Sequence, residues 1–539
     1  VMVAMNPQTY TQDAAEVVAG GTIIYDSTWP RDFGRSDVTQ IGVPIARLCA
    51  EAWVDPRQRQ LLKNIDYVGA LAWLIEIDMV IIEKLIAEQF KAKPKLIEAN
   101  LQALHMGRDW VAENVGERLP VRVRKANGTA GKIMISGNEA AGLGAVFAGA
   151  TVAAWYPITP STSVAEAFER YANRFRRNED GSLNVAVVQA EDELAAVGMA
   201  VGANWNGARS FTATSGPGIS LMSEFIGLAY FAEIPLVIYD IQRGGPSTGM
   251  PTRTQQSDIL ACAYASHGDT RHVLVIPGDP GECFTLSADA FDLAERLQTP
   301  VFVMSDLDIG MNDWVVDVLQ WDDQRRYDRG KVLNAAELEA TENFARYRDI
   351  DGDGIPWRTL PGTHPEKGAY FTRGTSHTDT GAYTEDGTIQ AATLDRINAK
   401  FETAKQMVPA PVIRTLSAKS RLGIINYGST DPAVGEALAL MMRDGHGLNH
   451  MRLRAFPFGP EVLDFIERHD YLFVVEQNRD AQMRQLLMVE AGAPAEKLVP
   501  VTNYDGLPLT ADFIIESVYA ALESNSRVAG ASAPPITTA

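Results

Sequence analysis

Three short polar segments contain the residue types that could do chemistry, and each directly follows an apolar run. They are Glu191-Asp192-Glu193, Ser215-Gly216-Pro217-Gly218 and Gln242-Arg243-Gly244-Gly245. A glutamate that is held away from bulk water accepts strong hydrogen bonds and can take part in proton transfer. An arginine presents a planar fork of donors that matches a carboxylate. A site built from these segments would combine a proton-transferring acid with an anion-binding arginine.

The elements that must position these segments have the pattern of a doubly wound α/β domain. Apolar strands are predicted over 185–188, 210–214 and 236–241, and a glycine-containing helix follows the first of them. Further strands are predicted over 132–136 and 151–155. Ligands of open parallel sheets bind beyond the carboxyl ends of the strands. We therefore expect the three polar segments to share one crevice.

The rest of the chain predicts further α/β units. Residues 1–118 begin with a strand, a helix and a strand and continue as helices, one of them buried over 67–82, like the back half of an α/β domain whose front half is missing. Strands and helices alternate again later in the chain, which predicts another parallel sheet. The expected boundaries are a linker over 119–130, a central domain over 131–322, a connecting segment over 323–415, a third unit over 416–522 and a flexible tail over 523–539.

Composition excludes several classes of protein. The net charge of −20 argues against a nucleic-acid partner, because phosphate binding requires an excess of lysine and arginine. Three cysteines without CxxC spacing fit neither a disulfide framework nor a four-thiolate iron–sulfur cluster, so we expect a reducing, cytoplasmic setting. The longest apolar run, 67–82, contains Glu76 and Asp78 and is too short to cross a bilayer, so no membrane partner is expected.

One acidic turn imitates a metal site. Asp349-Ile-Asp351-Gly-Asp353-Gly354 matches the start of an EF-hand loop, but Leu360 occupies the twelfth position and Pro356 interrupts the loop. We interpret it as an acidic turn, and we predict no metal site in this chain.

The order of four motifs resembles the alpha subunits of the thiamine-diphosphate-dependent 2-oxoacid:ferredoxin oxidoreductases. The motifs are Tyr156-Pro-Ile-Thr-Pro-Ser161, Glu191–Glu193 with its glycine-spaced helix, Thr214–Gly218 and Gln242–Gly249. Segments near 364–375, 426–430, 453–458 and 475–478 are similar to the 2-oxoglutarate branch. The resemblance implies several doubly wound open sheets: a pyrimidine-binding-type central domain, a transketolase C-terminal-like domain over 416–522, and a partial gamma domain fused at the N-terminus.

The same resemblance implies an activity and its partners. The reaction would be reversible oxidative decarboxylation of 2-oxoglutarate with coenzyme A to succinyl-CoA and CO₂, with electrons passed to ferredoxin. Thiamine diphosphate would be shared with a beta subunit that carries Mg²⁺ and a [4Fe-4S] cluster, and we expect an (αβ)₂ assembly. The chain shows no Gly-Asp-Gly stretch with a later Asn-Asn partner, so it would be inactive alone.

Glu193 is the residue that the resemblance assigns to cofactor activation. In this class of enzyme, a carboxyl group bonded to the pyrimidine N1′ favours the imino form, whose nitrogen then takes the C2 proton of the thiazolium ring. Matching the glycines of the following helix to the family selects Glu193, whereas a shifted match selects Glu191. Asp192 is expected only to favour the helix N-terminus electrostatically.

The substrate would be bound by Thr159 and Arg243, which match the family's substrate-side threonine and arginine. Arg253, Arg373 and His377 are further candidates for the distal carboxylate, and for these three a structural role is equally open.

The loop that contains Thr159 is also implied to contact the cofactor, through Tyr156, Pro157 and Ile158. The hydroxyls of Ser161 and Thr162 are expected to cap the next helix.

Three alternatives stay open from the sequence. The same chemistry could act on pyruvate or a branched-chain 2-oxoacid, or the chain could be a non-catalytic scaffold for a partner enzyme. An NAD-dependent dehydrogenase is the third, and it rests on the glycines of 142–149, although the third glycine comes too late for the dinucleotide fingerprint.

Overall fold

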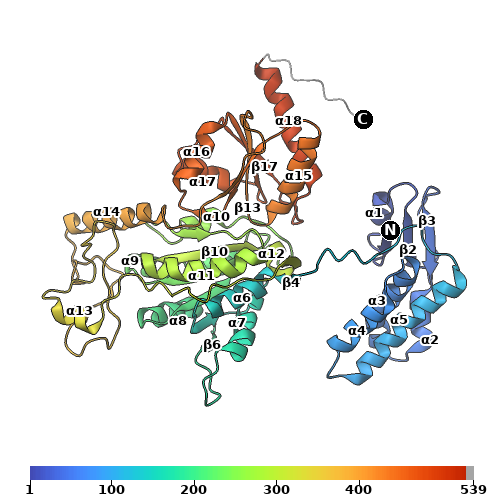
Figure 1. The fold of residues 1–539 in the computed structure, drawn as a ribbon, viewed down its shortest axis with the longest axis horizontal. Helices are drawn as coiled ribbons and strands as arrows, with labels where there is room; N and C mark the ends of the chain where they lie inside the picture. The colour runs from blue at the N-terminus through green and yellow to red at the C-terminus, as the bar shows by residue number, and fades with distance from the viewer. Residues whose placement is uncertain (530–539) are drawn as a thin grey trace. The chain divides into compact units, whose positions relative to one another are not determined.

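The computed structural model describes residues 1–529 and divides into two compact units, Val1–Ala130 and a second unit that starts at Gly131 (Figure 1). Each unit is described by itself. No helix among residues 1–529 is both long and apolar enough to cross a membrane.

The first unit contains a three-stranded parallel sheet in the order β1-β2-β3, followed by helices. Its elements are β1 (Met2–Ala4), α1 (Tyr10–Glu16), β2 (Thr22–Asp26), β3 (Thr39–Val43), α2 (Ile45–Ala52), α3 (Pro56–Leu74), α4 (Met79–Gln89) and α5 (Pro94–Asn114). Helices α3 and α5 pack closely, and Gly69 allows this because a Cβ at its position would overlap the Leu104 carbonyl.

The prediction of a single helix over 67–82 is wrong. Helix α3 ends at Leu74, and α4 begins after Asp78, whose side chain accepts a hydrogen bond from the Val80 amide. Glu76 lies between the two helices with a φ of 60° and pairs with Arg118 at 2.5 Å. The two acids in the apolar run therefore mark a turn between two helices.

The central sheet of the second unit has the order β15-β9-β10-β8-β7-β5-β6, and all neighbours are parallel except β15 and β9. Its strands are β5 (Val152–Trp155), β6 (Ala186–Gln189), β7 (Ser210–Thr214), β8 (Leu236–Gln242), β9 (Val273–Val275), β10 (Pro300–Asp306) and β15 (Ala455–Phe456). The strands that the sequence predicted within this sheet are confirmed to within about one residue at each end.

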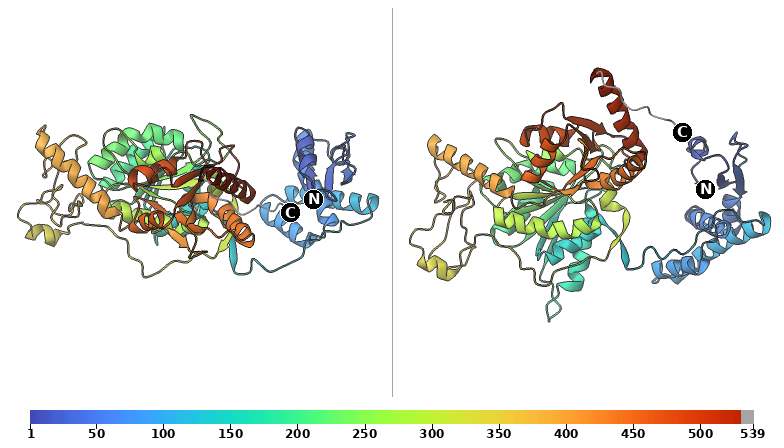
Figure 2. Two further views of the ribbon diagram at one scale, coloured as in Figure 1. Left: turned by 90° about the horizontal axis from the view of Figure 1, so that it is seen from above. Right: turned by 45° about the horizontal axis from the view of Figure 1, so that its top comes forward.

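Helices cover both faces of this sheet (Figure 2). Along β8, Leu236 and Ile238 pack with one set of helices, and Val237 and Tyr239 pack with the other. This alternation follows from the pleat of a strand and makes the domain doubly wound, as predicted. The helices are α6 (Gly137–Phe147), α7 (Thr162–Phe175) and α11 (Pro280–Leu297) on one face, with α8 (Glu193–Trp205), α9 (Gly216–Phe231) and α10 (Ile259–Ala263) on the other.

The predicted strand over 132–136 exists but lies outside this sheet. It is β4 (Lys132–Ser136), and it pairs in antiparallel register with β11 (Asp313–Asp317). The glycines of α6 serve helix packing, because a Cβ on Gly142 would lie 2.7 Å from Ala167 Cβ and one on Gly144 would overlap the Phe284 carbonyl. The feature that suggested dinucleotide binding thus has a packing explanation.

A largely irregular segment follows β11 and contains α13 (Ala335–Ala340) and α14 (Gly387–Ala404), which extend to one side of the sheets in Figure 1. Buried charges anchor it to the core. Glu233, at the end of α9, pairs with Arg396 at 2.5 Å and with Lys400 at 2.8 Å.

The C-terminal sheet has the order β12-β14-β13-β16-β17, with only β12 antiparallel. Its elements are β12 (Val412–Arg414), β13 (Leu422–Tyr427), α15 (Asp431–Arg443), β14 (Asn449–Leu453), α16 (Pro460–Arg468), β16 (Tyr471–Glu476), α17 (Gln482–Glu490), β17 (Leu498–Thr502) and α18 (Ala511–Ala529). The tail predicted over 523–539 is helical up to Ala529, and its remainder lies outside the described residues.

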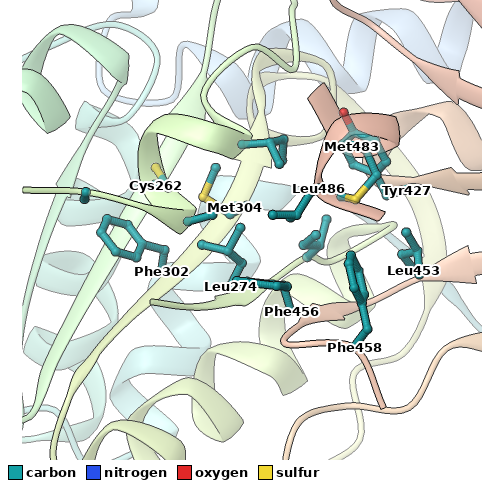
Figure 3. Packing of buried hydrophobic residues seen from close by; sticks show 14 of the residues in the cluster. Cys262, Leu274, Phe302, Met304, Tyr427, Leu453, Phe456, Phe458, Met483 and Leu486 are labelled. Carbon is teal, nitrogen blue, oxygen red and sulfur yellow. The ribbon is translucent and has the colours of Figure 1, made fainter. Parts of the chain in front are cut away.

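One apolar core joins the central and C-terminal sheets (Figure 3). Phe302 and Met304 of β10 belong to the same buried cluster as Tyr427, Leu453 and Phe456. Full burial of one such side chain stabilises a fold by about 1.5–3 kcal/mol. The shared core therefore fixes the two sheets relative to each other within this unit.

Candidate active site

The start of α8 separates the three candidate acids. Asp192 is the N-cap residue, and its Oδ1 accepts a hydrogen bond from the Ala195 amide at 2.7 Å. Glu191 is exposed, whereas only 7% of the Glu193 surface is accessible. The helix start therefore assigns Asp192 to capping and turns Glu193, but not Glu191, into the protein.

Glu193 lies against the first turn of α9. A Cβ built on Gly218 would lie 2.9 Å from Glu193 Cγ and would overlap Thr214 Oγ1, so only glycine fits at this contact. No group among the described residues donates a hydrogen bond to the Glu193 carboxylate. Its oxygens are not among the fully buried polar atoms without a partner, so they stay accessible at the protein surface. The carboxylate is thus positioned to accept a hydrogen bond from a ligand.

Arg243 directly follows β8 and is buried. Its Nη1 donates to the Thr159 carbonyl at 2.6 Å and its Nη2 donates to the Thr248 carbonyl at 3.2 Å. Its Nε is buried and has no partner among the described residues. The structure therefore brings the side chain of Arg243 to the backbone of Thr159.

Hydrogen bonds from a buried asparagine hold the loop that carries Thr159 in place. Asn138 is fully buried, and its Nδ2 donates to the Pro160 carbonyl at 2.8 Å and to Ser163 Oγ at 2.9 Å. Of the loop residues implied to contact the cofactor, Pro157 is exposed, and Tyr156 and Ile158 are half-buried.

The expected capping by Ser161 and Thr162 is wrong in its detail. Ser161 occupies the N-cap position of α7, but its side chain accepts no hydrogen bond from the helix. Both hydroxyls instead donate to the Ile158 carbonyl, at 3.1 and 3.2 Å. They therefore stabilise the loop before α7 rather than the helix itself.

A cleft of about 570 Å³ opens beside Arg243. The central domain contributes Gly216, Ser220 and Asp258, and the C-terminal domain contributes Arg479 and Tyr504 among others. Sequence reasoning missed this second wall and missed Asp258. No sequence motif indicates the second wall or Asp258. The wall forms only where the carboxyl ends of two separate sheets meet, which a local pattern does not reveal.

The candidates for the distal carboxylate are dispersed. Arg253 is exposed near Gly506, whose Cβ would lie 2.9 Å from Arg253 Cβ, so it lies close to the C-terminal domain. Arg373 donates from Nε to the Gly381 carbonyl at 2.9 Å, and His377 is buried against Phe231.

Arg373 and His377 belong to a segment that packs on the C-terminal half of α9, where a Cβ on Gly374 would meet Leu228. The cleft beside Arg243 lies at the N-terminus of the same helix, at Gly216 and Pro217. A helix of 16 residues is about 24 Å long. Within this chain, Arg373 and His377 are therefore not brought together with Arg243.

The acidic turn at 349–354 is closed by a lysine and by the backbone. Asp349 accepts hydrogen bonds from the amides of Asp351, Gly352 and Gly354. Lys331 pairs with Asp351 and Asp353, both at 2.7 Å. Each acid of the turn therefore has a partner within the protein, either Lys331 or the backbone.

Sequence comparisons place this geometry in a family. Residues 143–344 match the family model described as pyruvate flavodoxin/ferredoxin oxidoreductase, thiamine diP-binding, and residues 1–110 match that of pyruvate ferredoxin/flavodoxin oxidoreductase. Subunit alpha of 2-oxoacid:ferredoxin oxidoreductase 2 from Aeropyrum pernix is 31% identical over 476 residues, covering 85% of this chain and 71% of that protein. The chain belongs to the 2-oxoacid:ferredoxin oxidoreductase family as an alpha subunit.

Other relatives of this alpha subunit are named for 2-oxoglutarate. The 2-oxoglutarate synthase subunit KorA of Methanothermobacter thermautotrophicus is 34% identical over 68% of this chain and 93% of its own length. The 2-oxoglutarate oxidoreductase subunit KorA of Mycobacterium tuberculosis is 29% identical over 97% of this chain and 81% of its own length. A solved 2-oxoglutarate:ferredoxin oxidoreductase from Magnetococcus marinus, with 2-oxoglutarate, coenzyme A and succinyl-CoA bound, superimposes with a TM-score of 0.83 at 27% identity and covers 96% of this chain and 87% of that chain.

The residues present fit thiamine diphosphate, the cofactor of the matched domain. The aminopyrimidine of that cofactor needs an acceptor held out of bulk water, and Glu193 supplies a buried carboxylate that no neighbour occupies. Gly218 lets the first turn of α9 lie directly against the Glu193 side chain, which fixes the position of the carboxylate. Within the described residues, no cluster of three or more His, Cys, Asp or Glu side chains could hold a metal ion.

Proposed function

We propose that this alpha subunit takes part in the reversible, coenzyme A-dependent oxidative decarboxylation of 2-oxoglutarate to succinyl-CoA and CO₂, with ferredoxin as the electron acceptor. The observation that carries the proposal is the buried, unpartnered Glu193 at the same sheet edge as Arg243. The names of the KorA relatives and the ligands of the Magnetococcus marinus enzyme support 2-oxoglutarate as the substrate.

Each proposed role follows from the position of a side chain. Bound thiamine diphosphate supplies the carbon nucleophile for the 2-oxo group. Glu193 would accept a hydrogen bond from the aminopyrimidine ring of the cofactor and hold that proton in place. Tyr156, Pro157 and Ile158 would contact the same ring from the neighbouring loop.

Arg243 and Thr159 would bind the substrate. Backbone carbonyls use one N–H on each Nη of Arg243, and the guanidinium has five N–H donors, so others are left for a carboxylate oxygen. Thr159 is exposed, and its carbonyl accepts a hydrogen bond from Arg243. Arg253 would bind the distal carboxylate from the rim. Arg373 stays a prediction, because this chain does not bring it together with Arg243.

The surface around Glu193 suits a partner subunit. Leu194 and Met199 of α8 and Leu221 of α9 are 41%, 46% and 58% exposed, although all three are apolar. Helices α8 and α9 pack directly, through Gly198 and Phe225. We propose that a beta subunit covers this face, completes the cofactor site with its Mg²⁺ and carries the [4Fe-4S] cluster, in an (αβ)₂ assembly.

Turnover of the co-purified complex tests the substrate. The complex would be assayed with coenzyme A, oxidised ferredoxin and, in turn, 2-oxoglutarate, pyruvate and a branched-chain 2-oxoacid. We expect the largest kcat/KM for 2-oxoglutarate. A strong preference for pyruvate would remove the 2-oxoglutarate assignment and leave the chemistry intact.

A further inference from the structure

Asp258 lines the cleft opposite the first turn of α9. It precedes α10, yet its side chain makes no capping hydrogen bond to that helix. A Cβ built on Gly216 would lie 2.7 and 2.8 Å from the two oxygens of Asp258. The glycine therefore makes room for this carboxyl group, which faces the cleft instead of its own helix.

A second carboxyl group lies behind it. Asp240 of β8 is fully buried, and one of its oxygens accepts a hydrogen bond from Cys262 Sγ at 3.6 Å. Its other oxygen, Oδ1, has no partner among the described residues. Cys262 itself belongs to the apolar core between the sheets (Figure 3), so water does not screen Asp240 from that side.

The neighbouring groups do not neutralise this pair by direct contact. The nearest cation is Arg243, whose Nη1 and Nη2 already donate to backbone carbonyls, and no ion pair joins it to Asp258 among the described residues. On the other wall, Arg479 pairs with Asp480 at 2.7 Å, and Tyr504 completes the cleft.

Burial favours the protonated form of both carboxyl groups. Burial raises the pKa of Asp258 to about 6, and the positive charge of Arg243 opposes this shift in part. Burial raises the pKa of Asp240 well above its usual value, and the charge of Asp258 raises it further. A carboxyl group that keeps its proton can donate a hydrogen bond, whereas a carboxylate can only accept one.

We propose that Asp258 is a further ligand-contacting residue of this cleft, and that its protonated carboxyl group donates a hydrogen bond to an oxygen of the anionic ligand bound by Arg243. Asp240 lies behind this group and keeps its own proton, because burial and the charge of an ionised Asp258 both raise its pKa. The inference rests on the proposed function, which assigns Arg243 to the carboxylate of the 2-oxoacid.

The consequence is a pH dependence of substrate affinity. Below its pKa, Asp258 donates to the ligand, and above its pKa the same group is an anion that repels the ligand. KM for the 2-oxoacid should therefore rise with pH, by about tenfold for each unit once Asp258 is ionised in the free enzyme. The pKa of kcat should lie higher, because the bound ligand favours the proton.

Substitution in the co-purified alpha–beta complex tests the proposal. KM and kcat for 2-oxoglutarate would be measured between pH 6 and 8.5 for the wild type, Asp258→Asn and, as a matched control, Asp269→Asn, an exposed residue outside the cleft. We expect a flat KM for Asp258→Asn, because an amide donates at every pH. Asp269→Asn should keep the slope of the wild type.

One further measurement separates the outcomes. Calorimetric titration of the complex with 2-oxoglutarate, without coenzyme A, should show the same pH dependence in Kd. If KM and Kd of the wild type are independent of pH between 6 and 8, or if Asp258→Asn keeps the slope, the proposal is overturned while turnover still supports the proposed function. Absence of turnover with every 2-oxoacid would overturn the proposed function itself.

Discussion

Buried acids at the carboxyl ends of the two sheets in the second unit differ in one respect. In the C-terminal sheet, Glu476 accepts hydrogen bonds from Asn478 Nδ2 at 2.7 Å and from the Met483 amide at 2.8 Å, among others. In the central sheet, Glu193 accepts none from the described residues. Glu476 is fully buried and has its hydrogen bonds made within the chain, whereas Glu193 keeps 7% of its surface accessible and accepts no hydrogen bond from the described residues.

Asp306 shows that this difference does not separate one sheet from the other. It ends β10 of the central sheet, and it accepts hydrogen bonds from Ser429 Oγ at 2.6 Å, Gln256 Nε2 at 3.2 Å and the Ile309 amide at 3.1 Å. These contacts tie the central sheet to the C-terminal sheet. A buried acid with partners stabilises the fold, and a buried acid without partners indicates a ligand site.

The largest effect is expected for Glu193→Gln. An amide keeps the shape of the side chain but removes the charge, so kcat of the complex should fall by roughly 10²–10⁴-fold. The melting temperature and the assembly should be unchanged, because the chain itself makes no hydrogen bond to this group. Glu191→Gln is the matched control and should change kcat little, since Glu191 is exposed. An intact assembly with normal turnover in Glu193→Gln would favour the scaffold alternative.

Asp306→Ala should show the opposite pattern. Removing the carboxylate leaves Ser429, Gln256 and the Ile309 amide without their partner in a buried seam, which should lower the free energy of unfolding by about 3 kcal/mol. Denaturant unfolding of the complex would measure this loss. A stability equal to that of the wild type would contradict the comparison between Asp306 and Glu193, because the hydrogen bonds of Asp306 would then contribute nothing to folding.

Arg243→Lys should raise KM for the 2-oxoacid by about 10–100-fold, with a smaller change in kcat. Lysine keeps the charge but cannot donate to the Thr159 carbonyl, the Thr248 carbonyl and a substrate carboxylate in one plane. Steady-state kinetics over a wide substrate range would separate KM from kcat. An unchanged KM would show that Arg243 is structural, like the ion pairs elsewhere in the unit.

The smallest effect is expected for Asn138→Ala. Loss of the hydrogen bonds to Pro160 and Ser163 loosens the loop that carries Thr159, without touching the ligand. KM should rise roughly fivefold, which corresponds to about 1 kcal/mol. Ser163→Ala is a useful control, since it removes one of the two contacts and should have about half the effect on the binding free energy.

Local signals in the sequence predicted the elements around Glu193 and Arg243 well. The apolar strands β6, β7 and β8 and the polar residues after them follow from a short-range pattern. Residues after β7 and β8 line one cleft, as parallel pairing predicts, whereas Glu193 is not among the residues that line it. The resemblance to the family favours Glu193 over Glu191, and the burial of the two side chains agrees with that preference. The catalytic role of Glu193 stays a prediction.

Pairing between distant segments could not be predicted. The strand at 132–136 has the pattern of a core strand, yet it pairs with residues 313–317 outside the central sheet. Asp258 carries no motif, because its neighbours Asp240 and Gly216 come from different elements. The turn at Glu76 was missed because an apolar run outweighed two acids in the helical pattern.

The strand β15 ties the two domains of the second unit together in a further way. Ala455 and Phe456 leave the C-terminal sheet and hydrogen-bond to Val275 and Leu274 of β9, where they form the border of the central sheet. A fragment that stopped before residue 416 would expose the backbone of β9 as a bare edge, which favours self-association. Neither domain is thus a separable module, and any dissection of the subunit into independently expressed parts would have to keep residues 455 and 456 with the central domain.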